Sequence, residues 1–267
     1  MEISIKSRNR KVNNFFIGFD YDGTLAAPGY PVFPELIHKI IDVERVGVSL
    51  FFASGKNMPF IQNFVDKIGV NPRFICAENG GHIRDFTMGT DSFFGNSADL
   101  IRFDSLIQNE SLPLHEPEDK VSICTKRFGR NVLAAKKIIE TVISKNKLCL
   151  SVFTHPDGAL DIVPQGINKT NLLHYIPHEA VVHYIGDSYN DLGMMRHTRV
   201  LPHTVANAEQ DVKEVVRAKG GHIATTPVGL GVLIILRNIL ESLQSEMRIN
   251  NYYNNVRPSN MVMELII

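Results

Sequence analysis

The sequence predicts an α/β protein: a three-layer, Rossmann-like core with a parallel sheet, joined to a smaller α+β cap domain. Three apolar runs each end in small or acidic polar residues, as buried strands of a parallel sheet do. They cover residues 15–19, 48–53 and 181–185. The polar residues that could form a site are unevenly spaced along the chain. Asp20 and Ser54, which follow the first two runs, are 34 residues apart, whereas Ser54 and Lys169, a further candidate, are 115 residues apart. The short interval holds one βα unit, so the long one must contain an insert.

The first run ends in Asp20-Tyr21-Asp22-Gly23, which places two carboxylates one residue apart at the end of a strand. Open α/β sheets bind their ligands at this edge. Phosphoryl transfer uses two acids, because one carboxylate attacks phosphorus while the other protonates the leaving oxygen and later activates water. The same four residues also suit a simple strand-to-loop turn, in which Asp and Gly supply turn chemistry.

The second run leads into Ser54 and Gly55, and then into a helix that Pro59 opens within its first turn. The Ser54 hydroxyl and the backbone N–H groups at that helix start can bind phosphate oxygens. Farther along, Lys169 lies near the start of an amphipathic stretch, where a cation opposes the helix dipole. This lysine therefore needs an anion beside it.

The insert begins after a further core strand at 73–77, and the cap is expected to span residues 82–164. The core then comprises residues 1–81 and 165–267. Apolar alternation and the Pro-Asp-Gly turn predict a hairpin near the end of the cap. The expected cap elements are strands at 121–125, 148–154 and 159–163 and a helix at 132–145.

The third run delivers Asp187 and Asp191, whose oxygens suit Mg²⁺ together with water and phosphate ligands. Behind it, helical spacing and glycine stops predict that further elements complete the core. These are strands at 200–202 and 222–225 and helices at 209–219 and 228–243. The tail 248–267 fits no pattern and is expected to be either an oligomer contact or a loosely packed extension.

Four short motifs in this order resemble those of the haloacid dehalogenase-like (HAD) hydrolase superfamily. They are DYDGTL at 20–25, ASG at 53–55, Lys169 and GDSYND at 186–191. The resemblance implies that Asp20 is the nucleophile and Asp22 the general acid/base. It also implies site roles for further residues. Asp20, Asp22 and Asp187 would bind Mg²⁺, Ser54, Gly55, Lys169 and Asn190 would hold the phosphate or substrate, and Asp191 would orient Lys169 or support the metal shell.

The insert resembles the C2B-type cap of Cof-like and sucrose-phosphatase-like phosphatases. The implied function is a Mg²⁺-dependent phosphatase that hydrolyses a small phosphate monoester, a sugar phosphate first, through an aspartyl-phosphate. A phosphomutase or phosphotransferase of the same fold is the alternative within catalysis, and a sugar-phosphate-binding protein without turnover is the alternative outside it. Metal-free dehalogenase chemistry is disfavoured, because phosphatases of the family carry the second aspartate that Asp22 supplies.

Several other residues have one or two expected roles. Glu78 and Asn79 are expected either to touch the leaving group or to form a turn, and Lys56 to face solvent. The segment 205–208 resembles that of Cof-like phosphatases, which implies that Asn207 lies near the metal. Four cap cations are either contacts for a second anionic group of the substrate or ordinary surface charges. They are Lys120, Lys126, Arg127 and Arg130.

Composition favours an ordinary cytoplasmic enzyme, and the resemblance implies that its partner is a small phosphorylated metabolite. A formal net charge of zero gives no nucleic-acid signal, and no apolar stretch is long enough to span a membrane. Three widely spaced cysteines fit reduced thiols. We expect a monomer or homodimer, and we expect His155, His183 and His203 to be structural or surface residues.

Overall fold

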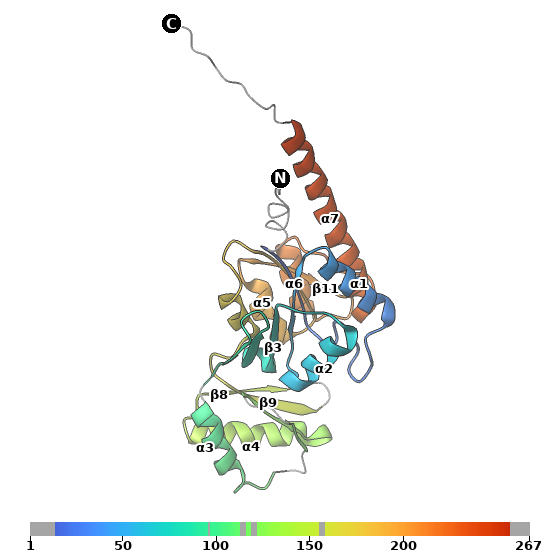
Figure 1. The fold of residues 1–267 in the computed structure, drawn as a ribbon. Coiled ribbons are helices and arrows are strands. Elements are labelled where there is room, and N and C mark those ends of the chain that lie inside the picture. The colour runs from blue at the N-terminus through green and yellow to red at the C-terminus, as the bar shows by residue number, and fades with distance from the viewer. Residues whose placement is uncertain (1–13, 96, 113–115, 119–121, 155–157, 257–267) are drawn as a thin grey trace.

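A computed structural model of the chain describes residues 14–95, 97–112, 116–118, 122–154 and 158–256. Within these residues the strands form two sheets. The larger has seven strands in the order β11-β10-β1-β2-β3-β4-β5, and the smaller has four in the order β6-β7-β9-β8. Figure 1 shows the small sheet beneath the core, with helices α3 and α4 on the side away from it.

The centre of the large sheet is parallel, as the three apolar runs predict. β1 (Phe15–Phe19) pairs with β10 (Val181–Gly186) on one side and with β2 (Ser49–Ala53) on the other. β3 (Phe74–Ala77) and β11 (Val200–Thr204) continue the sheet outward, also in parallel. Four of the five residues of β1 and of β2 are buried, as expected for strands covered on both faces.

Alternate residues of β1 enter two separate hydrophobic clusters, which makes the core three-layered. Ile17 and Phe19 pack with α1 (Pro34–Arg45), α2 (Met58–Ile68) and α7 (Val228–Val256). Phe16 lies in the opposite cluster. The helices of that second layer are α5 (Leu192–Arg196) and α6 (Gln210–Ala218).

Helix α2 begins directly behind the loop that follows β2. The side chain of Asn57 accepts a hydrogen bond from the N–H of Phe60, and Pro59 lies in the first turn, where a missing N–H costs little. Gly69 ends the helix in the left-handed conformation that favours glycine. These caps fix the point at which the chain leaves the Ser54 loop.

The expected start of the cap at His82 is displaced by a hairpin. β4 (His82–Asp85) pairs antiparallel with β3, and β5 (Thr90–Phe93) pairs antiparallel with β4, so both strands extend the large sheet. The sequence did not reveal these two strands for two reasons. An antiparallel hairpin has no crossover helix to mark it, and its polar residues interrupt the apolar run by which a buried strand is recognised. We therefore place the start of the cap after Phe93.

The cap is a four-stranded antiparallel sheet covered by two helices. Its helix α4 (Val132–Lys145) and its hairpin of β8 (Leu150–Thr154) with β9 (Ala159–Pro164) lie where the sequence predicts them. The other elements are α3 (Ser97–Ile107), β6 (Glu116–Glu118) and β7 (Cys124–Arg127), of which α3 and β6 were not predicted. A third hydrophobic cluster, which includes Phe103, Ile139 and Leu160, joins the sheet to both helices.

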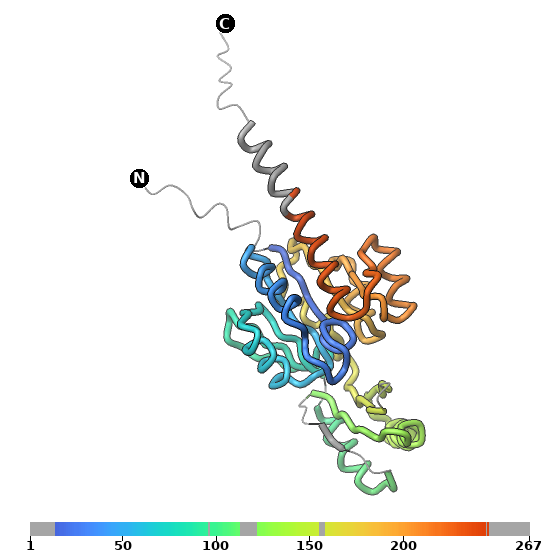
Figure 2. Tube along the Cα trace, turned by 90° about the vertical axis from the view of Figure 1, so that its right-hand side faces the viewer, coloured from blue at the N-terminus to red at the C-terminus, as the bar shows by residue number. Residues whose placement is uncertain are grey.

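The end of the chain differs from the sequence prediction in two ways. Residues 222–225 form no strand and are joined to β11 by an isolated bridge between Thr204 and Ile223 and by contacts of His222 with His203. Helix α7 continues past the predicted end at Leu243 to Val256, because the loss of apolar periodicity there is not accompanied by a helix stop. Figure 1 shows it extending beyond the core, and in Figure 2 its first turns lie against the core. Residues 257–267 of the predicted tail lie outside the described residues.

No helix in the described part of the chain combines the length and the apolar composition that a membrane crossing requires. All three cysteines lie in described segments and are free thiols.

Candidate active site

The carboxyl ends of β10, β1 and β2 lie side by side and bring together residues that are far apart in the sequence. Asp187 follows β10, Asp20 follows β1 and Ser54 follows β2. This is the edge at which open parallel sheets bind ligands. The small sheet of the cap faces the same end of the core in Figure 1.

Asp20 is paired with a lysine that solvent does not reach. The Nζ of Lys169 donates to Oδ1 of Asp20 over 2.7 Å, and Lys169 is 0% exposed while Asp20 is 4% exposed. Lys169 opens a 3-10 helix (Lys169–His174) rather than the α-helix that the amphipathic pattern suggests. The anion that this buried cation requires is therefore the Asp20 carboxylate, together with a second acid.

That second acid is Asp191, which is 0% exposed. Its Oδ1 accepts from Nζ of Lys169 over 2.7 Å and from the hydroxyl of Tyr184 over 2.6 Å. Its Oδ2 accepts from the backbone N–H groups of Asp187 and Ser188 at 3.0 and 3.1 Å. Gly186 permits this approach, because a Cβ there would lie 2.5 Å from Cγ of Asp191. Asp191 thus fixes the ammonium group of Lys169 against Asp20.

The carboxylate of Asp187 is held by the loop that follows β1. Its Oδ1 accepts from the hydroxyl of Thr24 over 3.0 Å, and its Oδ2 lies 3.4 Å from Nδ2 of Asn207. Asn207 also donates to the carbonyl oxygen of Gly23 over 2.8 Å. Gly23 has φ +79°, and a Cβ on it would lie 2.2 Å from Oδ2 of Asp187, so the close approach of the two loops requires glycine.

The electrostatics of the cluster favour a bound cation. Oxygens of Asp20, Asp187 and Asp191 lie within 4.8 Å of one another, and Lys169 supplies one positive charge against these three acids. Burial raises the pKa of Asp20 to about 7 despite the opposing effect of Lys169. Burial and repulsion by Asp20 and Asp191 raise the pKa of Asp187 to about 8. Hard carboxylate oxygens with excess negative charge fit a divalent cation such as Mg²⁺.

Asp22 lies at the open side of this cluster and has a partner that the sequence interpretation missed. The Nζ of Lys56 is 2.9 Å from Oδ2 of Asp22, and each side chain is about one-third exposed. The ammonium group also lies 5.3 Å from the ring centroid of Phe60, against which Tyr21 packs edge-on. Lys56 therefore does not simply face solvent. Its contact requires the loops after β1 and β2 to meet, and the sequence alone gives no sign of this.

Ser54 is buried next to Gly55, and its hydroxyl oxygen accepts from the backbone N–H of Lys56 over 3.2 Å. A hydroxyl that accepts in this way keeps its own proton available for donation. Asn190 lies in the turn after β10, and its Nδ2 donates to Oδ1 of Asn79 over 3.1 Å. The structure thus places the residues of the four motifs around the carboxyl ends of three neighbouring strands.

Glu78 and Asn79 form the turn that was one of their two expected roles. Both have positive φ, +53° and +56°. Glu78 is 1% exposed, and its Oε2 accepts from the backbone N–H of Ser122 over 2.6 Å, so it connects the core to the segment before β7. The buried carboxylate of Glu78 is thus engaged with the cap.

The cap cations differ in exposure and in their contacts. Nζ of Lys126 lies 3.7 Å from Oδ1 of Asp104 on α3, so this side chain pairs with the helix layer of the cap. Arg130 is exposed, and Lys120 lies outside the described residues. His183 and His203 are buried and hydrogen-bonded to each other over 2.8 Å, away from the acidic cluster, whereas His155 lies outside the described residues.

Comparison with known proteins identifies relatives along most of the chain. A family model described as haloacid dehalogenase-like hydrolase matches residues 17–93 and 96–226. A phosphomannomutase of Nicotiana benthamiana is 26% identical over 230 residues, which cover 73% of this chain and 90% of that protein.

Solved structures with the same fold include a hydrolase and a phosphatase. A haloacid dehalogenase-like hydrolase from Bacteroides thetaiotaomicron aligns with a TM-score of 0.67 at 20% identity, covering 84% of this chain and 98% of that one. The sucrose-phosphatase from Synechocystis, solved with sucrose and phosphate, aligns with a TM-score of 0.60 at 15% identity and covers 84% and 97%. At these identities the likeness concerns the fold.

Proposed function

The chain belongs to the haloacid dehalogenase-like hydrolases, and from this we propose that it is a Mg²⁺-dependent phosphatase that hydrolyses a small phosphate monoester through a phosphorylated Asp20. One observation carries the proposal. Asp20 stands at the carboxyl end of β1, with Lys169 on one of its oxygens and Asp187 close enough to share a cation with it. This arrangement supports a nucleophile, a fixed ammonium group and a metal site around one point.

In the first half-reaction the Asp20 carboxylate attacks phosphorus, and the bond to the ester oxygen breaks. Asp22 gives its proton to that oxygen, and the alcohol leaves. Lys169 and the hydroxyl of Ser54 hold the phosphoryl oxygens, while Asp191 keeps Lys169 in place. In the second half-reaction Asp22 takes a proton from water, the water oxygen attacks phosphorus, and the bond to Asp20 breaks to release phosphate.

Asp20 and Asp187, with the backbone carbonyl of Asp22, are the groups that would hold Mg²⁺. The ion would offset the negative charge of the acidic cluster and of the phosphate, which is the usual electrostatic requirement of phosphoryl transfer. Thr24 and Asn207 set the orientation of Asp187. Asp191 is unsuited to direct coordination, because both its oxygens already accept hydrogen bonds from Lys169, Tyr184 and backbone N–H groups.

A sugar phosphate is the substrate class that we favour. The relatives include a phosphomannomutase by sequence and a sucrose-phosphatase by fold, both of which are named for sugar chemistry. The similarity to the phosphomannomutase favours a second candidate, in which the phosphoryl group of Asp20 passes to a sugar hydroxyl rather than to water. We further propose that the protein works in the cytoplasm as a monomer or homodimer.

Release of inorganic phosphate from a panel of esters tests the proposal. The panel contains hexose 1- and 6-phosphates, phosphoglycolate and p-nitrophenyl phosphate, each with Mg²⁺ and with chelator. We expect metal-dependent release by the wild type, loss of release by Asp20→Asn, and unchanged release by Asp211→Asn, an exposed acid on α6. Conversion of a hexose 1-phosphate to its 6-phosphate without phosphate release would favour the mutase. Equal rates for wild type and Asp20→Asn would contradict both candidates.

A further inference from the structure

Asn79 occupies an unusual position between the phosphate-holding loop and the cap. Its backbone has φ +56° and ψ 28°, a left-handed conformation that asparagine adopts more readily than most residues. Its N–H donates to the carbonyl oxygen of Ser54 over 2.9 Å. The turn after β3 is therefore attached through its backbone to the loop after β2.

The amide side chain of Asn79 joins three parts of the protein. Its Oδ1 accepts from Nδ2 of Asn190, in the loop that follows β10, over 3.1 Å. Its Nδ2 lies 3.4 Å from Oδ2 of Asp161, on cap strand β9. A Cβ on Gly55 would lie 3.3 Å from the same Nδ2, so the amide packs over the Ser54-Gly55 loop.

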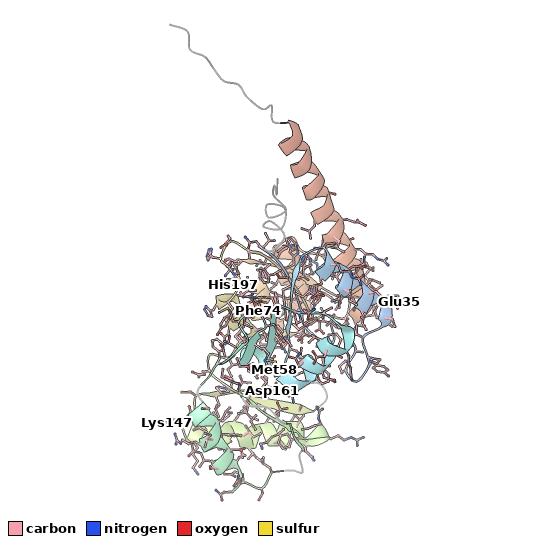
Figure 3. All side chains as sticks on the ribbon, viewed as in Figure 1. Glu35, Met58, Phe74, Lys147, Asp161 and His197 are labelled. Carbon is pink, nitrogen blue, oxygen red and sulfur yellow. The ribbon has the colours of Figure 1, made fainter. Side chains whose placement is uncertain are left out.

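The side chain of Asp161 takes no part in the hydrophobic cluster of the cap. Its neighbours on β9, Leu160 and Ile162, enter the cluster that includes α3 and α4, so the carboxylate points to the opposite, core-facing side. It is 1% exposed, and its Oδ1 accepts from the hydroxyl of Thr125. Figure 3 labels Asp161 at the boundary between the cap sheet and the core.

We propose that Asn79 is a positioning residue that couples the seating of the cap to the geometry of the phosphate-holding loop. When β9 lies against the core, Asp161 and Asn190 fix the amide of Asn79 from two sides, and the amide and its backbone N–H hold the loop of Ser54 and Gly55. An anion bound by that loop and the seated cap therefore stabilise each other, because coupling between two sites is reciprocal. The inference rests on the proposed function in taking this loop as the phosphate site.

Hydrogen exchange of the full-length protein tests the coupling without an activity assay. The probe is inorganic phosphate with Mg²⁺. In the wild type we expect added phosphate to slow amide exchange along β9, and we expect this protection to be lost in Asn79→Gly. Glycine adopts φ +56° without strain, so this variant removes the amide and keeps the turn. If β9 is not protected in the wild type, or is protected equally in Asn79→Gly, the coupling is absent.

Two variants at Asp161 test the same contact from the cap side. Asp161→Asn keeps one oxygen that can accept from Asn79, and its amide N–H can donate to the hydroxyl oxygen of Thr125 in place of the original bond. It should therefore retain the phosphate-induced protection, whereas Asp161→Ala should lose it. If Asp161→Ala unfolds the cap, the comparison of Asp161→Asn with Asn79→Gly still decides. If Asp161→Asn and Asn79→Gly both lose the protection of β9, or both keep it, the assignment to the Asn79 amide is overturned.

Kinetics separate this role from simple support of the fold. With p-nitrophenyl phosphate we expect Asn79→Gly to lower kcat/KM about 10-fold, within the usual range of coupling between sites. The double variant, Asn79→Gly with Asp161→Ala, should have a kcat/KM no lower than that of the less active single variant. Effects that multiply would contradict the coupling. A wild type that hydrolyses no ester but gains β9 protection from phosphate would refute the proposed function and leave the coupling standing.

Discussion

Nζ of Lys56 lies 2.9 Å from Oδ2 of Asp22, so the proposed general acid/base is held by a cation from the neighbouring loop. The backbone of Lys56 is fixed at both ends, because its N–H donates to Oγ of Ser54 and its carbonyl oxygen accepts from the N–H of Glu78. Contact with the ring of Phe60 limits the side chain further. Lys56 thus sets where the Asp22 carboxylate rests.

Lys56→Met should therefore lower kcat more than it changes KM. We expect about a 10-fold loss, a small part of the rate that general acid–base catalysis usually supplies. Stability should change by less than about 1 kcal/mol, because the pair is partly exposed. Steady-state kinetics and urea denaturation measure the two effects. Lys56→Arg should recover most of the rate, and Lys67→Met, an exposed lysine on α2, should behave as wild type. A Lys56→Met enzyme with an unchanged kcat would exclude the positioning role.

Mg²⁺ should raise the thermal stability of the protein through the Asp187 site. Binding to the folded state alone stabilises it by about 2.7 kcal/mol at one hundred times the dissociation constant. Asp187→Asn removes one charge of the acidic cluster, so the variant should gain much less from Mg²⁺. Thermal denaturation over a Mg²⁺ titration measures this gain. The exposed-acid variant Asp211→Asn serves as the matched control, and an equal gain in Asp187→Asn would place the ion elsewhere.

Lys169→Met should remove activity and destabilise the fold, because it leaves Asp20 and Asp191 buried without their shared cation. Breaking a buried pair in this way typically costs about 3–5 kcal/mol. The deficit should be larger at pH 8 than at pH 5. A carboxyl group whose pKa is raised in the folded state binds its proton more tightly there, so stability falls as the pH rises through that value. Urea denaturation of both proteins at the two pH values checks this, and a deficit independent of pH would count against the buried-charge explanation.

The residues of the site could be predicted from the sequence because they follow strands that are easy to recognise. A strand buried on both faces must be apolar along its length, so β1, β2 and β10 appear as uninterrupted runs and their polar ends are conspicuous. The order of those ends was enough to suggest Asp20, Ser54 and Asp187 as one site. The hairpin in the cap was equally clear from its turn residues.

Contacts between loops could not be predicted in the same way. The pairing of Lys56 with Asp22 and of Asn79 with Asp161 depends on where separate chain segments meet, and neither pair has a sequence spacing that indicates contact. Polar elements were missed for a related reason. β5 is mostly exposed, so it lacks the apolar run that marks a buried strand, and the boundary of the cap was placed before its hairpin with β4.

A stack of three histidines between β10, β11 and the segment that follows α6 predicts acid sensitivity. The backbone N–H of His222 donates to Nδ1 of His203, so Nε2 of His203 carries the proton and donates to Nδ1 of His183. Both bonds require neutral rings. Burial, with a smaller effect from His222, lowers the pKa of His183 to about 4, and burial lowers the pKa of His203 well below its ordinary value.

The free energy of unfolding should therefore fall as the pH is lowered from about 6.5 towards 4. In this window the unfolded chain binds protons that the folded histidines refuse, and each such group contributes a slope of about 1.4 kcal/mol per pH unit. His203→Gln keeps an amide N–H that can reach His183 and cannot titrate, so it should reduce the slope by about that amount. Urea denaturation at pH 7, 6 and 5 measures both slopes. The control is His38→Gln, which replaces an exposed histidine of α1 and should leave the slope unchanged. Equal slopes for wild type and His203→Gln would mean that the buried stack does not cause the loss of stability at low pH.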